Sequence, residues 1–209
     1  IEDSIAVIAP HVTTDAGITS IDAGFYSGDV SVPSVVHKDG TAYPVGKIGE
    51  YAFGSSYRLN SLTIAEGVTE IEPEAFRASS MKTITLPASA TVNSRSAFEI
   101  CRKLEEVNIS PDNPEYVSSE GCASIAEKSS GRLLKAFRKI PASVSSIASG
   151  AIRGSGITEL RIPAGVTQIE PGAFSGCSIE HIEIDPANTV FDTTPGLNCV
   201  IEKSTGRLI

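Results

Sequence analysis

Five short segments of the chain alternate apolar and polar residues. In one of them Ile84 and Leu86 are apolar, while Thr83 and Thr85 are polar. Alternation with a period of two places the apolar side chains on one face of a β-strand and the polar ones on the other. A Pro or Gly follows most of these segments, which favours a turn there. The pattern therefore predicts five short strands, at residues 59–64, 81–86, 104–109, 157–162 and 179–184.

A second pattern, in which an Ile precedes an Ala-aromatic pair, comes before each strand. Residues 70–76 are Glu-Ile-Glu-Pro-Glu-Ala-Phe, and residues 168–174 are Gln-Ile-Glu-Pro-Gly-Ala-Phe. Pro and Glu suit the first turn of a helix, so we expect one short helical turn in each copy. The Ala of the pair recurs at positions 52, 75, 97, 151 and 173, in steps of 23, 22, 54 and 22 residues.

The chain is thus a tandem repeat of a unit of 22–23 residues. Such a unit cannot bury its own apolar stripe, but stacked units bury it against their neighbours. The strands would then lie about 4.8 Å apart in a parallel sheet. We expect one elongated right-handed solenoid, with Ile152 in the aromatic position of a degenerate copy. The equivalent aromatic residues should form one buried wall: Phe53, Phe76, Phe98 and Phe174.

Two longer units depart from this spacing. The 54-residue step contains an enlarged repeat near residues 110–141, and a second one occupies residues 185–209. Lys-Ser-Ser-Gly at 128–131 and Lys-Ser-Thr-Gly at 203–206 lie between β-forming flanks, so both are expected to be hairpin turns. The chain stops where the first copy continues into another coil. Because a natural cap differs from an interior unit, we expect a truncated C-terminus.

Residues 1–44 do not follow the repeat. They contain two segments expected to be strands, at 4–9 and 28–36, and a turn at 38–41. A solenoid needs an atypical first unit to cover the open end of its core. We therefore expect an N-terminal β capping segment over residues 1–44 and the solenoid over residues 45–209, with a separate functional module at residues 1–44 as the alternative.

The copies share the pattern Val-x-x-Ile-x-x-x-Ala-Phe-x-x-Cys/Ser, followed by Leu-x-x-Ile/Leu-x-Ile-Pro. Residues 166–177 and 68–86 match it closely, whereas residues 92–95 depart from it. From Tyr26 onward the chain resembles the BspA-type leucine-rich repeats of bacterial surface proteins. The resemblance implies a leucine-rich-repeat solenoid (an α/β superhelix, β-rich with short helical turns). It also implies a secreted or cell-surface, outer-membrane-associated protein that takes part in adhesion, with host matrix proteins as candidate partners.

Composition narrows the range of partners. The formal net charge is −8 and the pI is about 4.9, which disfavours nucleic acid because such ligands require a basic face. The largest clusters of basic residues are pairs such as Arg102-Lys103. No apolar run approaches the roughly 20 residues that a membrane-spanning helix needs.

Motifs for catalysis, cofactors or metals are missing from the sequence. The three His residues are far apart, at positions 11, 37 and 181, and no phosphate-binding loop or nucleophile elbow occurs. Glu105-Glu106 could be paired catalytic carboxylates, but neighbours on a strand point to opposite faces, which favours a solvated edge. We therefore expect a protein that is not an enzyme and has no cofactor.

Two acidic turns could suggest calcium. Asp112-Asn113 and Asp185 with Asn188 stand beside Pro residues. Asx residues at such positions form turns through their own side chains, so a structural turn is favoured over an ion site.

The four cysteines show neither metal-ligand spacing nor the density of a disulfide-stapled domain: Cys101, Cys122, Cys177 and Cys199. Cys101 and Cys177 follow their Phe residues by three positions in coils that are not adjacent. Their Cα atoms should then lie about 10 Å or more apart, too far for a bridge. We expect both to be reduced and buried.

The outward residues of the strands form the candidate binding face. One per coil gives the row Thr63, Thr85, Asn108, Arg161 and Glu183. The row two residues earlier is Ser61, Thr83, Glu106, Glu159 and His181. Two functions fit such a face: a binding or adhesion module that contacts proteins, or a structural spacer of a larger surface protein with no strong ligand of its own.

Overall fold

The computed structural model describes residues 6–9, 12–15, 18–21, 26–92, 95–194 and 198–209, so the irregular entry expected at residues 92–95 lies partly outside the described residues. The chain divides into two compact units, which we call unit 1 (residues 1–114) and unit 2 (residues 115–209). The expected boundary between residues 44 and 45 stays a prediction, as does the right-handed winding of the coils.

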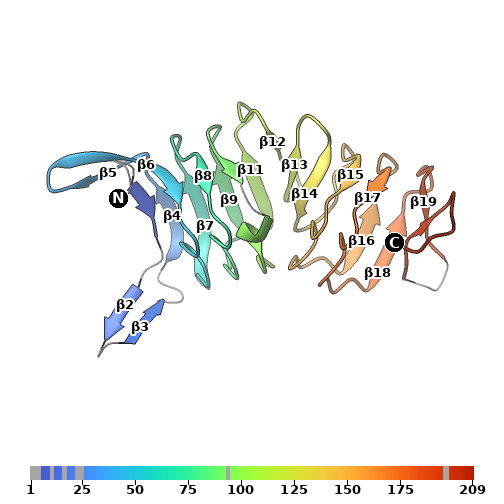
Figure 1. Ribbon diagram of the computed structural model, residues 1–209, viewed down its shortest axis with the longest axis horizontal. Helices are drawn as coiled ribbons and strands as arrows, with labels where there is room; N and C mark the ends of the chain where they lie inside the picture. Colours follow the sequence, from blue (N-terminus) through green and yellow to red (C-terminus); the bar gives the residue numbers. More distant parts are fainter. Residues whose placement is uncertain (1–5, 10–11, 16–17, 22–25, 93–94, 195–197) are drawn as a thin grey trace. The chain divides into compact units, whose positions relative to one another are not determined.

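Unit 1 contains two parallel sheets, whose strands follow one another from coil to coil (Figure 1). The first, the strand face, has the order β11-β9-β7-β4, with β4 Ser27–Val32, β7 Arg58–Ile64, β9 Thr83–Leu86 and β11 Glu106–Ile109. The second has the order β1-β6-β8-β10, with β1 Ala6–Ile8, β6 Thr41–Ile48, β8 Glu70–Ile71 and β10 Thr91–Val92. Strand β5 (Val35–Lys38) pairs antiparallel with β6, and β2 (Val12–Asp15) with β3 (Ile18–Ile21).

Unit 2 repeats this plan with an enlarged coil. Its strand face has the parallel pair β16 (Glu159–Ile162) and β18 (His181–Ile184). Its other sheet has the order β12-β13-β14-β15-β17, with β12 Tyr116–Val117, β13 Ser124–Glu127, β14 Arg132–Ala136, β15 Ser146–Ile147 and β17 Gln168–Ile169. Strands β19 (Phe191–Asp192) and β20 (Ile201–Glu202) pair antiparallel.

The five strands expected from alternation are confirmed, and so is their parallel pairing within each unit. Within the observed strands the apolar residues are buried, apart from the partly buried Ile109, and the polar residues face outward. In β16, Leu160 and Ile162 are buried while Glu159 and Arg161 are exposed. The hairpin expected at residues 128–131 joins antiparallel strands β13 and β14. Residues 203–205 likewise form a turn, and Ile201 pairs antiparallel with Leu208 across it.

The expected helical turns are wrong for most coils. Within the described ranges, the one helix is η1, a single 3-10 turn at Arg95–Phe98. The other Ala-aromatic segments are hydrogen-bonded turns. The residue before the Ala has a left-handed backbone, with φ of 56° at Tyr51 and 59° at Glu74. A right-handed helical turn cannot pass through such a residue, so the chain turns at this point instead.

The aromatic wall is confirmed in unit 1. Phe53, Phe76 and Phe98 are fully buried, and their ring centroids lie 6.1 Å and 4.9 Å apart. Tyr26 extends the series, with its ring 4.6 Å from that of Phe53. The prediction is wrong for Phe174, which lies in unit 2 and is only partly buried. In unit 2, Ile152 fills the aromatic position and is fully buried.

Candidate functional site

Three residues of the predicted binding row lie side by side on the strand face of unit 1. Thr63 is in register with Thr85, and Thr85 with Asn108, on the neighbouring strands β7, β9 and β11 (Figure 1). Ser31 of β4 continues the row next to Thr63. All four side chains are at least partly exposed. Unit 1 therefore presents a row of small, uncharged hydrogen-bonding groups.

The row two residues earlier is also in register in unit 1, and acidic residues stand at both of its ends. Asp29 pairs with Ser61, Ser61 with Thr83, and Thr83 with Glu106. The Asp29 carboxylate accepts hydrogen bonds from Ser61 Oγ at 2.6 Å and Asn60 Nδ2 at 2.7 Å. These two donors, Ser61 first, lower the pKa of Asp29 below its usual range.

The other two residues of the predicted row lie together in unit 2. Arg161 of β16 is in register with Glu183 of β18, and Glu159 with His181. All four are exposed. The Arg161 guanidinium donates to an Asp185 oxygen at 3.2 Å. Unit 2 thus presents a charged strand face, whereas that of unit 1 is mostly neutral.

A hollow of about 460 Å³ opens on the strand face of unit 2. Its floor includes Ile140 and Leu160, and charged side chains surround it: Arg138, Lys139, Glu159, Arg161, Glu183 and Asp185. It lies where the enlarged coil reaches the strand face, since residues 137–138 form bends rather than a strand.

Arg138 and Lys139 are the residues of this hollow that the strand pattern misses. The sequence does carry a signal for Lys139. It precedes Ile140-Pro141 just as Arg161 precedes Ile162-Pro163. The signal is obscured because residues 132–141 contain no polar-apolar alternation like that of the other copies.

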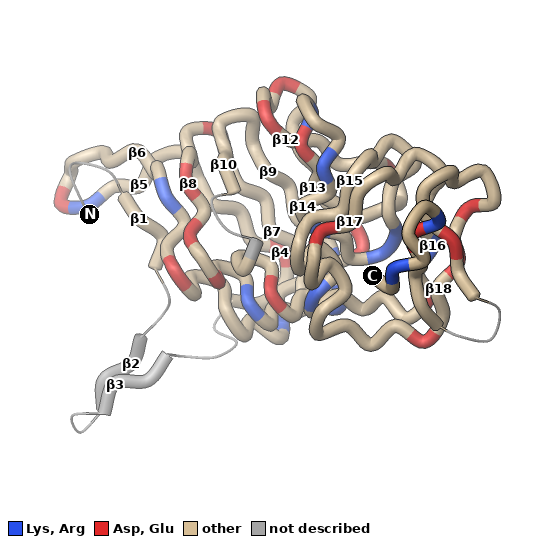
Figure 2. Tube along the Cα trace, turned by 45° about the vertical axis from the view of Figure 1, so that its right-hand side comes forward, with Lys and Arg blue, Asp and Glu red and all other residues tan. Residues whose placement is uncertain are grey.

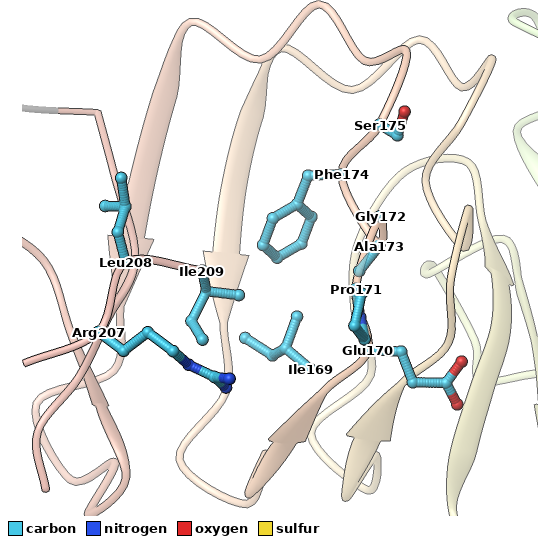
Figure 3. A pocket seen from close by; sticks show the side chains of 10 residues that line it. All are labelled: Ile169, Glu170, Pro171, Gly172, Ala173, Phe174, Ser175, Arg207, Leu208 and Ile209. Atoms are coloured by element: carbon cyan, nitrogen blue, oxygen red, sulfur yellow. The ribbon is translucent and has the colours of Figure 1, made fainter. Parts of the chain in front are cut away.

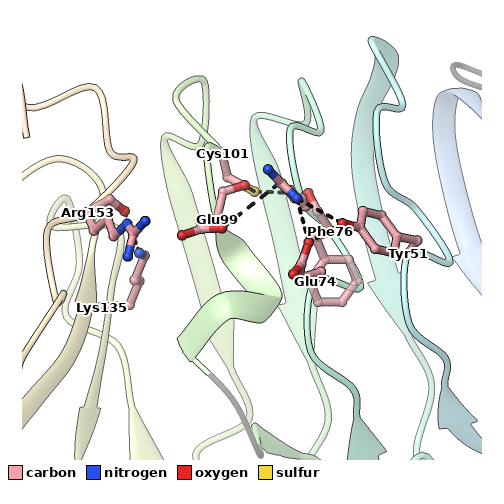
Figure 4. A network of polar contacts seen from close by, with 8 residues as sticks. Tyr51, Glu74, Phe76, Glu99, Cys101, Lys135 and Arg153 are labelled. Atoms are coloured by element: carbon pink, nitrogen blue, oxygen red, sulfur yellow. Dashed lines mark hydrogen bonds and ion pairs between the residues drawn. The ribbon is translucent and has the colours of Figure 1, made fainter. Parts of the chain in front are cut away.

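The opposite wall of unit 1 carries charged contacts between coils. Tyr51 and Glu74 come from adjacent coils, and the Tyr51 hydroxyl donates to the Glu74 carboxylate (Figure 4). Arg77 Nη1 donates to both groups, at 2.8 Å to Tyr51 and 2.7 Å to Glu74. The Tyr51 hydrogen bond, followed by that from Arg77, lowers the pKa of Glu74.

A Glu in the Ile-Glu-Pro segment joins coils in both units. Glu72 accepts from Glu50 N at 2.7 Å and pairs with Lys47 at 2.6 Å. The contact with Lys47 is the main cause of the lowered pKa of Glu72. Glu170 accepts from Ser149 N at 2.9 Å and pairs with Arg132 at 2.7 Å. These polar groups hold neighbouring coils together.

The two acidic turns have structural roles. Asn113 is buried, and its Nδ2 donates to Pro87 O and Ala90 O of the preceding coil. Asn188 donates in the same way to Pro163 O and Val166 O, each at 2.9 Å. Both amides are thereby fixed as donors to the main chain of the preceding coil. The expected local turn is seen at Asn188, whose Oδ1 accepts from Val190 N and Phe191 N. Where residues are described, no group of three or more His, Cys, Asp or Glu side chains could hold a metal ion.

An apolar hollow of about 390 Å³ lies beside Phe174 in unit 2. Figure 3 shows the Phe174 ring, Ile169 and Ile209 around it, with Leu208 further out. This hollow explains why Phe174 is only partly buried: its ring faces open space rather than another ring.

The cysteines differ from the expectation in one respect. All four are free thiols in the structure, and Cys101 is fully buried. Cys177 is only partly buried, and it follows a turn whose residues Ser175 and Gly176 are exposed. Burial raises the pKa of the Cys177 thiol, and the positive charge of Lys135 offsets this in part.

Parallel strands that recur once per coil define a leucine-rich-repeat solenoid protein. A family model, the BspA type leucine-rich repeat region, matches residues 12–127 and 133–194 with six copies, and the chain belongs to this family. Among curated proteins, none matches the chain. The described part of the chain has no helix with the length and apolar character needed to cross a lipid bilayer.

Several solved structures are similar. A leucine-rich repeat protein from Eubacterium ventriosum is 18% identical, with 75% of this chain and 59% of that chain covered and a TM-score of 0.44. One from Bacteroides ovatus is 24% identical, with 88% and 41% covered and a TM-score of 0.43. A leucine rich cell surface protein from Faecalibacterium prausnitzii is 21% identical, with 96% and 60% covered and a TM-score of 0.39. The chain thus spans between 41% and 60% of the length of these three.

Proposed function

We propose that this chain is a non-catalytic adhesion module of a secreted or cell-surface bacterial protein, associated with the outer membrane, and that its strand faces bind partner proteins. The observation that carries the proposal is the registered rows of exposed polar side chains, such as Thr63, Thr85 and Asn108. Host matrix proteins are the candidate partners. Membership of the BspA-type family supports this, because leucine-rich repeats generally mediate protein contacts.

The chemistry of the rows sets the kind of contact. No Phe, Tyr or Trp stands in the rows, although Tyr, Trp and Arg are the usual centres of binding energy in protein interfaces; Arg161 is the one such residue in them. Small polar side chains at fixed spacing favour a broad contact that is weak per coil and depends on several coils at once. The proposed partner is therefore a large surface and not a small molecule.

Residues 1–44 are proposed as the cap of the right-handed solenoid. Strands β1 and β4 support this, since they stand at the ends of the two strand orders of unit 1. They would cover apolar residues of the first coil that otherwise face water.

Surface plasmon resonance of the purified chain over immobilised matrix proteins and glycans tests the function. Saturable binding to a matrix protein supports the adhesion module. Uniform absence of binding favours the alternative, a structural spacer of a larger surface protein.

A triple variant tests the face itself. Replacing Thr63, Thr85 and Arg161 with Glu should abolish binding to the captured partner, because three new carboxylates disrupt the rows. Folding should survive, since exposed substitutions of this kind usually change stability by less than about 0.5 kcal/mol each. Circular dichroism checks the fold. Full binding by the folded triple variant would place the contact on another face.

A further inference from the structure

The hollow on the strand face of unit 2 combines open space with charges that have no partner of their own. Arg161 and Asp185 are paired with each other at 3.2 Å. Lys139, Glu159 and Glu183 also line the hollow and are exposed, and no ion pair joins any of them to another described residue. A bound partner can therefore use these three charges without breaking an existing pair.

The positive and negative charges of the hollow lie on different segments of unit 2. Lys139 follows the bends of the enlarged coil, next to Arg138 in sequence. Glu159 and Glu183 lie on the neighbouring strands β16 and β18. They are diagonal neighbours, since Glu159 is in register with His181 and Glu183 is two residues further along. Diagonal neighbours on adjacent strands are within reach of long side chains, so one extended cationic side chain of a partner can contact both carboxylates.

The lining disfavours several classes of ligand. The lining carries three cationic groups and three carboxylates, so a polyanion such as a nucleic acid or a sulfated glycan would be attracted by the first and repelled by the second. The one aromatic ring in the lining is the imidazole of His181, and no Phe, Tyr or Trp offers a larger face for stacking against a sugar or a base. The charged rim also disfavours a purely apolar ligand, whose binding would remove these groups from water without a partner.

We infer that this hollow binds an extended polypeptide segment of mixed charge, with a basic residue against Glu159 and Glu183 and an acidic residue against Lys139. Charge complementarity on both sides selects such a segment over one of a single sign. The inference rests on the proposed function, since it specifies what part of a partner protein unit 2 would recognise. Charges of both signs occur along unit 2 (Figure 2), and the hollow is where they meet an unfilled surface.

The test uses three synthetic heptapeptides and the isotope-labelled full chain. The mixed peptide is acetyl-Gly-Glu-Glu-Gly-Lys-Lys-Gly-amide, and the two others carry four Glu or four Lys in place of the charged blocks. Amide chemical shifts are followed by NMR at low salt. The mixed peptide should perturb residues 138–140, β16 and β18 and should bind several-fold more tightly than either single-sign peptide. Equal binding of all three, or perturbation confined elsewhere, would overturn the inference.

Charge variants make the test specific. Lys139→Glu and Glu183→Lys should each weaken the mixed peptide about threefold to tenfold, as expected for the loss and reversal of one exposed ion pair. A triple variant, Lys139→Glu with Glu159→Lys and Glu183→Lys, keeps both signs and exchanges their sides. The peptide can bind it in the reverse direction, so affinity should return. Lys82→Glu is the matched control, because Lys82 is an exposed cation of unit 1 that does not line the hollow.

The peptide result is independent of binding to matrix proteins. If matrix binding is saturable but indifferent to Lys139→Glu and Glu183→Lys, the inference fails and the proposed function stands. If the peptide binds as expected but no matrix protein does, the hollow recognises mixed charge and the choice of partner class in the proposed function is wrong.

Discussion

The turns of the two units differ at two equivalent positions where the backbone is left-handed. In unit 1 these positions carry side chains: Tyr51, Ser55, Glu74, Ala78 and Ile100. In unit 2 they carry only glycine: Gly150, Gly154, Gly172 and Gly176. A side chain in this conformation costs about 1–2 kcal/mol, whereas glycine adopts it freely. Unit 1 bears this strain, and at two of the positions the side chains join coils through the contact between Tyr51 and Glu74.

The aromatic wall shows the same contrast. Unit 1 stacks Phe rings without interruption, while unit 2 has Ile152 and then a partly exposed Phe174. The same fold therefore holds its coils together in two ways. Both units join coils through a Glu of the Ile-Glu-Pro segment, but unit 1 adds side-chain contacts at its left-handed turns, whereas unit 2 has glycine there and an enlarged coil. Coils with the same repeat pattern can therefore be stabilised by different contacts.

The largest expected effect comes from the aromatic wall. Phe76→Ala should lower the free energy of unfolding by about 3–5 kcal/mol, because it removes a fully buried ring between two others. Phe174→Ala is the matched change in unit 2 and should cost about 1–2 kcal/mol, since that ring is already partly in water. Urea denaturation measures both. A loss below about 1 kcal/mol for Phe76→Ala would contradict the stacked wall.

The next largest effect on stability is expected from replacing the glycines at the left-handed turns of unit 2. Gly150→Ala should cost about 1–2 kcal/mol from backbone strain alone, because the new Cβ meets nothing closer than Arg153 Cβ at 3.9 Å. Gly172→Ala should cost somewhat more, since its Cβ would lie 3.3 Å from Ser149 Oγ. The reverse change in unit 1, Ala78→Gly, relieves strain and should leave stability unchanged or slightly higher. Thermal unfolding of the three variants decides whether the two units differ as described.

Acid should weaken the contacts between coils of unit 1. The pKa values of Glu72 and Glu74 are lowered in the folded protein from an ordinary value of 4.5. Their contribution to stability is therefore complete above pH 4.5 and is lost as the pH falls through the lower folded values. Glu72→Gln should reduce stability at pH 7 and flatten the dependence on pH below 4.5. Denaturation midpoints between pH 3 and pH 7 test this, and an unchanged slope in the variant would count against it.

The smallest effect is on reactivity and leaves stability untouched. Ellman's reagent should label the partly buried Cys177 faster than the fully buried Cys101, which reacts only when unit 1 opens. Under denaturing, non-reducing conditions all four cysteines should react. A count of zero, as two disulfides would give, contradicts the prediction that Cys101 and Cys177 are reduced.

Much of the fold could be predicted because its cause is periodic. Alternation correctly predicted the strand at residues 83–86 and its neighbours, and the 22–23-residue spacing correctly predicted their parallel order within each unit. The left-handed turns at Tyr51 and Glu74 were not predictable in the same way, because neither Tyr nor Glu indicates a left-handed backbone. Gly150 and Gly172 do give that sign, so comparison between the copies could have revealed it.

The candidate site was predictable only in part. Outward strand residues such as Thr85 and Asn108 follow from alternation, and the structure places these two in register. Arg138 and Lys139 could not be found that way, since they reach the strand face of unit 2 from the enlarged coil, where alternation ends. Which residues surround a hollow depends on where the chain bends, and bends leave no period in the sequence.

The buried amides of Asn113 and Asn188 bear on how such a protein changes length during evolution. Each anchors the start of an enlarged coil to two carbonyl oxygens of the coil before it. With that anchor in place, residues can be inserted or deleted in the following loop while the earlier coils keep their register. Asn188 also accepts from the backbone of Val190 and Phe191, so the direction in which the loop departs is set as well. Such an anchor would allow a new loop to arise at these two points of the stack without refolding the rest.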